Sequence, residues 1–317
     1  MSRVTQISVL EEFSSVLLIS DKSLIAYHLD IVCPPPTNGP APAASNDSLR
    51  KAPQKLSGSK DVGFFVTGRM KDRTLVFYKK RENLASVFKV LEPIYQKSTE
   101  KKRGMFRRGT TEFFREFDEF YIPTECSDIN LFHKTLSVST NRGFEVMMLD
   151  KKQPWSVPEL KAPHVQNIAT HIKDQKALSM MRLSDQEFLL VYAQCAVYVN
   201  KHGDISRSVI MEFVGTANAA ALYGAYLILF DNDFVEIRNA QNGRLKQIIA
   251  GREIKMLDDG GSWSSAPTGP TEGTNGTATG PVVNGRTVKL VMQHPEMEKT
   301  QIVVELLLNE NMKDEFT

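Results

Sequence analysis

The sequence predicts an all-β fold, and three observations support this prediction. First, a unit made of an apolar run, a short polar turn and a second apolar run occurs six times, at residues 17–27, 64–78, 136–149, 188–199, 226–238 and 288–308. Short apolar runs bounded by turn residues are typical of buried strands. Second, most of the turns carry Asp, Asn, Lys or Gly, which tolerate the backbone conformations of tight hairpins. Third, Asn242-Gly243 is the strongest single hairpin signal in the chain.

The spacing of the six units indicates a β-propeller. Once two low-complexity segments are removed, most units follow one another at roughly 40–50 residues, the period of a four-stranded propeller blade. Radial packing of blades also leaves only short, protected sheet edges. A two-sheet sandwich is the structural alternative, and six hairpins fit it less well.

Two segments have the composition of inserts. Residues 33–60 are rich in Pro, Ala, Ser and Asn, and residues 258–285 are rich in Gly, Thr, Ser and Pro. Such segments bury too little apolar surface to offset the entropy of ordering. We therefore expect a single domain over residues 1–317, with both segments outside its core.

Composition excludes several classes of protein. A hydrophobic content of 41% and a net charge of +2 are ordinary for a globular protein and give no argument for nucleic acid. The three cysteines, Cys33, Cys126 and Cys195, show no metal-binding or disulfide spacing. The N-terminus lacks the apolar core of a secretory signal, and the longest apolar run, residues 219–230, is shorter than the about 20 residues that span a bilayer. We expect a cytoplasmic protein.

Enzymatic signatures are missing from the sequence. It contains no phosphate-binding loop, dinucleotide fingerprint, nucleophile elbow or HExxH motif, and its six histidines show no metal-ligand spacing. Glu116 and Glu119 could be read as an acid–base pair, but residues 113–121 alternate aromatic and charged side chains, which predicts a strand. We expect no catalytic residue, cofactor, metal or small-molecule substrate.

The densest charge feature is a basic run over residues 97–108. Its candidate contact patch for acidic lipid consists of Lys101, Lys102, Arg103, Arg107 and Arg108. Thr110 follows an Arg-Arg-Gly sequence favoured by basophilic kinases, and a phosphate there would add nearly two negative charges beside the arginines. A solvated loop is the alternative interpretation. Aromatic residues do not alternate with the basic ones, so nucleic-acid binding is not expected.

Several segments taken in order resemble the citron homology (CNH) domain of fungal Rho-type guanine nucleotide exchange factors of the cell-wall-integrity pathway. The most specific are Phe114-Arg-Glu-Phe, Phe120-Tyr-Ile-Pro-Thr-Glu-Cys126 and Arg142-Gly-Phe-Glu-Val146. Others are residues 4–12 followed by 17–24, 88–93, 198–201 with Ser206-Arg207, and 234–238 with Gly251. The resemblance covers nearly the whole chain outside the two inserts.

This resemblance implies a seven-bladed propeller whose N-terminal blade is incomplete in this chain, because only six hairpins are counted. It also implies a regulatory protein-interaction module that contacts a Rho-type small GTPase or the rest of an exchange factor, without the catalytic exchange module itself. The alternative is a membrane or vesicle-tethering module that binds acidic lipid through residues 97–108, with recruitment to the plasma membrane.

Overall fold

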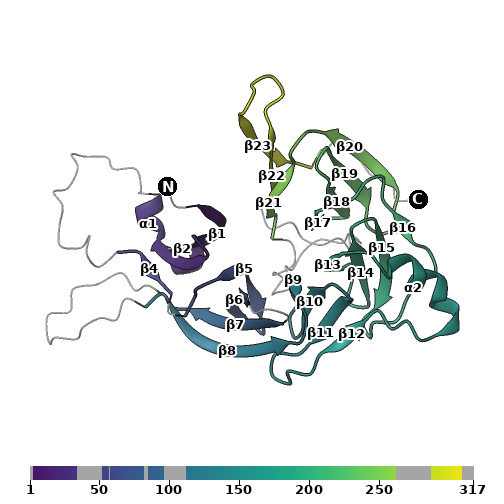
Figure 1. Ribbon diagram of the computed structural model, residues 1–317, viewed down its shortest axis with the longest axis horizontal. Helices are drawn as coiled ribbons and strands as arrows, with labels where there is room; N and C mark the ends of the chain where they lie inside the picture. The colour runs from purple at the N-terminus through teal and green to yellow at the C-terminus, as the bar shows by residue number, and fades with distance from the viewer. Residues whose placement is uncertain are drawn as a thin grey trace, which may run out of the picture. The chain divides into compact units, whose positions relative to one another are not determined.

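The described residues form six antiparallel β-sheets, and the chain divides into two compact units, Met1–Glu125 and Cys126–Thr317. The computed structural model describes residues 3–33, 52–56, 58–81, 85–95, 112–261 and 287–308. Consecutive strands pair as neighbours throughout, so each sheet is a simple meander (Figure 1).

The first unit contains two four-stranded sheets. The strands of the first sheet are β1 (Val4–Leu10), β2 (Ser15–Ser20), β3 (Ser23–His28) and β4 (Gln54–Lys55). Those of the second sheet are β5 (Val62–Met70), β6 (Arg73–Arg81), β7 (Ser86–Pro93) and β8 (Phe114–Ile122). A 3-10 turn, η1 (Glu11–Phe13), and a short helix, α1 (Leu29–Val32), complete the unit.

The second unit contains four sheets. One sheet contains β9 (Cys126–Leu131), β10 (Leu136–Thr140), β11 (Gly143–Met147) and β12 (Trp155–Val157). The next sheet contains β13 (Ala177–Arg182), β14 (Glu187–Tyr192), β15 (Cys195–Asn200) and β16 (Met211–Glu212). A third sheet contains β17 (Ala219–Tyr223), β18 (Tyr226–Phe230), β19 (Phe234–Asn239) and β20 (Leu245–Ala250). The last sheet contains β21 (Lys255–Asp259), β22 (Val288–Gln293) and β23 (Gln301–Leu306). Between β12 and β13 lie η2 (Pro163–Val165) and α2 (Gln166–Ile172).

The all-β prediction is confirmed, whereas the prediction of seven blades is wrong. The described residues form six sheets of the propeller-blade type, and each contains one of the six hairpins expected from the sequence. The first sheet has four strands and is not the incomplete one, because β4 supplies its fourth strand; the sheet with three strands is the last. The number of apolar hairpins in the sequence therefore equals the number of described sheets. The prediction of a seventh blade rested on the family resemblance alone.

The two predicted inserts fall largely outside the described residues, which leave out 34–51, 57 and 262–286. At the margin of the first, β4 pairs with β3, and the hydroxyl of buried Ser59 donates to the carbonyl oxygen of Leu56 at 2.6 Å. At the margin of the second, β21 continues to Asp259. Both sheet edges thus extend into segments whose composition gave no sign of a strand.

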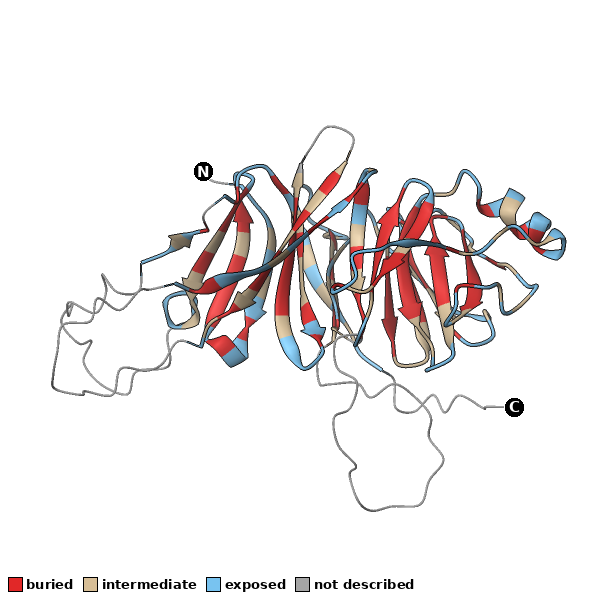
Figure 2. Cartoon of the chain, turned by 90° about the horizontal axis from the view of Figure 1, so that it is seen from below, coloured by how far each residue is buried: buried red, intermediate tan, exposed pale blue. Residues whose placement is uncertain are grey.

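Strands in the middle of a sheet are buried on both faces. In β14, Leu189 and Val191 belong to one apolar cluster, whereas Leu190 and Tyr192 belong to the cluster on the opposite side. Successive side chains of a strand point to opposite faces, so a strand between two neighbouring sheets needs apolar residues at every position. Figure 2 shows buried residues concentrated in the strands and exposed residues in the connecting turns. This explains why the sequence shows continuous apolar runs.

The predicted strand over residues 113–121 is β8, and its aromatic face is interrupted by a bulge. Phe120 is buried as alternation predicts, but Phe117 is 40% exposed. The register with β7 shifts between Glu116 and Asp118, so Phe117 is the extra residue of the bulge. The guanidinium of Arg73 lies over its ring, 5.7 Å from the centroid.

Side-chain hydrogen bonds also join neighbouring sheets of the second unit. The Asn130 amide on β9 accepts a hydrogen bond from the backbone N–H of Met180 on β13 at 2.7 Å, and donates one to the hydroxyl of Ser179 at 2.9 Å. The Ser139 hydroxyl donates to the carbonyl oxygen of Leu178 at 3.1 Å. These bonds fix the position of one sheet on the next, a task that apolar contacts alone perform poorly.

We predict that Asn130→Ala lowers the free energy of unfolding by about 1–3 kcal/mol, because it leaves the Met180 N–H without its acceptor. Urea denaturation followed by circular dichroism measures the loss. Asn167→Ala, on the exposed side of α2, is the control and should change stability little. Equal midpoints for the Asn130 variant and the wild type would contradict the assignment.

Candidate protein-interaction surface

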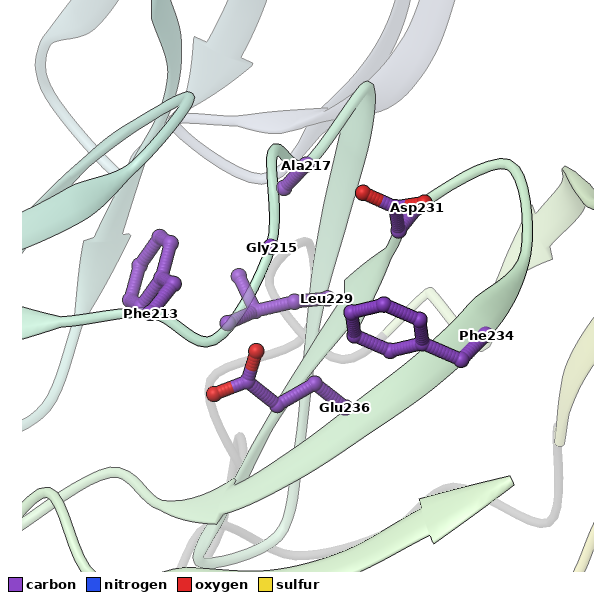
Figure 3. Close-up of a pocket in the computed structure, with 7 residues that line it drawn as sticks. All are labelled: Phe213, Gly215, Ala217, Leu229, Asp231, Phe234 and Glu236. Atoms are coloured by element: carbon purple, nitrogen blue, oxygen red, sulfur yellow. The ribbon is translucent and has the colours of Figure 1, made fainter. Parts of the chain in front are cut away.

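A shallow recess lies where residues 213–217 cross the face of the β17–β20 sheet. Its lining residues are Phe213, Gly215, Ala217, Leu229, Asp231, Phe234 and Glu236 (Figure 3). Three of them belong to the crossing segment, and the others lie on or beside β18 and β19. A segment between two sheets thus forms one wall of the recess and a sheet face forms the other.

The crossing segment is held by hydrogen bonds to the β17–β20 sheet. The N–H groups of Val214 and Thr216 donate to the carboxylates of Glu236 and Asp231, each at 2.9 Å. A Cβ atom added at Gly215 would come within 2.5 Å of the Phe234 ring, closer than real Cβ contacts allow. Only glycine therefore lets the segment approach the sheet this closely.

The carboxylate of Glu236 is the buried charge of this region. Its side chain is 2% exposed and pairs with the guanidinium of Arg238, which is 12% exposed. Arg238 also donates to the carbonyl oxygen of Gly243 at 2.8 Å and lies over the ring of Phe213, 5.9 Å from its centroid. The carboxylate is engaged by an ion pair and by the N–H of Val214, so it serves the structure.

Three exposed apolar side chains surround this ion pair. Ile248 on β20 lies directly opposite Glu236 and Leu245 lies directly opposite Arg238, so both point to the same face as the pair. The backbone N–H of Val214 donates to Glu236 of this face, and the Val214 side chain is exposed. Exposed fractions are 62% for Val214, 46% for Leu245 and 43% for Ile248. We call this set of three residues the β20 surface; apolar groups gathered in this way are typical of protein-binding sites.

Arg207 holds the turn that leads into β20 through a set of contacts that we call the Arg207 node. Arg207 pairs with Glu187 at 2.5 Å, lies 4.0 Å from the ring centroid of Tyr198, and donates to the carbonyl oxygen of Gln241. The Tyr198 hydroxyl donates to the carbonyl oxygen of Ala240 at 3.0 Å. Burial raises the pKa of Tyr198, which keeps the hydroxyl protonated as a donor. The β19–β20 turn is thereby fixed to the β13–β16 sheet.

A second electrostatic feature lies on β9, which neighbours β13 in the same unit. Burial raises the pKa of Asp128 to about 7; a hydrogen bond to the Ile129 backbone opposes the rise, and the carboxylate of Asp259 adds to it. A carboxyl group that titrates near neutrality is a frequent marker of functional sites. Within the described residues, however, no group of three or more histidine, cysteine or acidic side chains could hold a metal ion.

The site residues predicted from the sequence are not placed by the structure. The basic contact patch and the phosphorylation site lie outside the described residues: Lys101, Lys102, Arg103, Arg107, Arg108 and Thr110. None of the described helices is both long and apolar enough to cross a bilayer. Lipid contact and phosphorylation therefore stay predictions.

Sequence reasoning missed the β20 surface and Asp128. Val214 is distant in sequence from Leu245 and Ile248 on β20, and only the register of β19 with β20 and the hydrogen bond to Glu236 relate the three residues. The one local signal was Asn242-Gly243, which marked the turn before β20; Gly243 has the positive φ of 73° that this turn requires.

The six sheets define a β-propeller type of protein. A family model described as the CNH domain matches residues 1–260, and the chain belongs to this family. It is 31% identical to Rho1 guanine nucleotide exchange factor 1 of Schizosaccharomyces pombe over 81% of this chain and 19% of that protein. It is 27% identical to Rho1 guanine nucleotide exchange factor 3 of the same yeast over 96% of this chain and 22% of that protein.

A solved structure agrees with the sequence comparisons. The AfRom2 CNH domain superposes with a TM-score of 0.70 and 26% identity, over 96% of this chain and 81% of that one. The chain spans about a fifth of the length of the curated relatives that it matches. The family is therefore shown, and the activity of the longer relatives is not thereby assigned to this chain.

We predict that Arg238→Met lowers the free energy of unfolding by about 3 kcal/mol, because it leaves the buried Glu236 carboxylate without its cation. Arg244→Met, at an exposed position in the following turn, is the matched control. Urea titration of both variants measures the difference. If the two variants lose the same free energy of unfolding, Arg238 does not stabilise the buried Glu236 carboxylate as described.

We also predict that stability falls as pH rises from about 4 to about 7. In this range folded Asp128 holds a proton that the unfolded chain has released, because burial raises its pKa to about 7 from the ordinary 3.8. Asp128→Asn stays neutral, so relative to wild type it should gain stability between pH 5 and pH 8. Urea midpoints at both pH values test this, with Asp174→Asn as an exposed control. A wild-type-to-variant difference that is the same at both pH values would contradict the assignment.

Proposed function

We propose that this chain is a regulatory protein-interaction module of a Rho-type guanine nucleotide exchange factor. Its contact is with a Rho-type small GTPase or with other parts of the exchange factor. The observation that carries the proposal is membership of the CNH family together with 31% identity to a Rho1 exchange factor. Because the chain spans about a fifth of that relative, exchange activity itself is not proposed for it.

The described site supports binding over catalysis. Its two recess carboxylates, on Asp231 and Glu236, accept backbone hydrogen bonds, and Glu236 is also neutralised by Arg238. Apolar side chains beside them are exposed and stand on sheets fixed by burial and by the Arg207 node. Such a rigid support with an exposed apolar surface suits recognition of another protein, where a few well-placed apolar groups supply most of the affinity.

The test is binding of the purified chain to a fungal Rho GTPase in its GDP, GTP-analogue and nucleotide-free forms, with nucleotide release followed in the same samples. We expect saturable binding without accelerated release. Accelerated release would overturn the assignment of a non-catalytic module. If no form of the GTPase binds, a pull-down with the remaining domains of an exchange factor tests the other proposed contact. If these domains do not bind the chain either, the proposal is overturned.

A further inference from the structure

One side of β20 is open to a further strand. This strand ends its sheet, and within the described part of the chain nothing pairs with its outer side. The N–H of Gly251 donates to the carbonyl oxygen of Asp233 at 2.9 Å, and Ile249 pairs with Val235 in the same register. Hydrogen-bonding direction alternates along an antiparallel strand, so the N–H and C=O groups of Ile248 and Ala250 point away from β19.

The other fourth strands of the described sheets are poorer templates. β4 and β16 have two residues each and β12 has three, while β8 has nine residues but carries Arg115, Glu116, Asp118 and Glu119. Short length and charged side chains are the usual means by which proteins block pairing at a sheet edge. β20 has six residues, and Lys246 is its only charged one. Among the fourth strands, it alone is both long enough and weakly protected.

The β20 surface provides side-chain contacts for an added strand. Leu245 and Ile248 lie on β20 itself, directly opposite Arg238 and Glu236. An added strand directs alternate side chains to this face, next to Leu245 and Ile248. In strand addition, main-chain hydrogen bonds supply affinity and contacts with alternate side chains supply specificity. The edge and the apolar surface therefore form one binding site.

The charge around β20 indicates which segment fits. Residues 244–255 contain four basic side chains, Arg244, Lys246, Arg252 and Lys255, against one acidic side chain, Glu253. Arg244 and Arg252 are exposed and stand at opposite ends of the strand. A segment with acidic residues at both ends of an apolar stretch is attracted to this arrangement, and a basic one is repelled.

We propose that β20 binds an extended segment of a protein partner as a fifth strand, with alternate apolar side chains against Leu245 and Ile248 and acidic residues at its two ends. This inference rests on the proposed function, because it specifies how a protein-interaction module would take its partner. It does not depend on which protein carries the segment.

The experiment is a display selection of random peptides of roughly nine residues, long enough for one strand and its flanks, against the purified chain. A selected peptide is then synthesised, labelled and titrated. We expect the selection to enrich peptides with alternating apolar residues and acidic ends. Failure to enrich any such peptide overturns the inference.

Two pairs of variants locate the bound peptide. Ala250→Pro removes an N–H that points away from β19, at a position where an edge strand tolerates proline. Peptide binding should therefore weaken at least about tenfold, while the circular dichroism spectrum of the folded chain stays the same. Ala250→Ser should bind as the wild type does. Arg244→Glu/Arg252→Glu should weaken binding by at least about tenfold, whereas Lys173→Glu/Lys201→Glu, with the same change in charge at exposed positions elsewhere, should not.

Peptides that bind Ala250→Pro and Arg244→Glu/Arg252→Glu as tightly as the wild type would overturn the inference. The GTPase titration separates this result from the proposed function. If the GTPase or the remaining exchange-factor domains bind the chain but no peptide is held at β20, the strand-addition inference fails and the proposed function stands. If neither they nor a peptide binds, both fail.

Discussion

The whole structure depends on the packing of each sheet's apolar face against the next sheet. In the second unit, one cluster joins the β9–β12 sheet to the β13–β16 sheet, another joins that sheet to β17–β20, and a third joins β17–β20 to β21–β23. The described core of this unit is divided among these three clusters, so a sheet that lies between two of them must be apolar on both faces. Burial of this kind is the main favourable term in folding, and it is distributed here over successive interfaces.

Polar groups decide how the apolar faces align. Asn130 sets β9 against β13, and Arg207 ties the turn before β20 to the preceding sheet. The pair of Glu236 and Arg238 is of another kind, because both charges are largely withdrawn from water. Such pairs contribute little net stability but are costly to break, so they favour one arrangement over its alternatives. The exposed apolar residues of the β20 surface are held in place by this arrangement.

The same packing explains why the proposed binding surface lies at an outer strand. Within the described residues, a central strand is paired on both edges, whereas a fourth strand is paired on one edge only. At β20 the unpaired edge coincides with apolar side chains and flanking basic residues, a combination that the other fourth strands of the described sheets lack. The proposed strand addition uses this edge.

The sequence by itself determined the all-β class, the six hairpins and the family, because these depend on local apolar runs, turn residues and ordered motifs. It also identified β8 and the Asn242-Gly243 turn, which are local patterns. Tertiary structure decided the number of strands in each sheet, the exposure of Phe117 at a bulge and the raised pKa of Asp128. It also brought the backbone of Val214 next to Glu236 on β19. These features depend on strand register and on contacts between distant segments, which no local pattern in the sequence specifies.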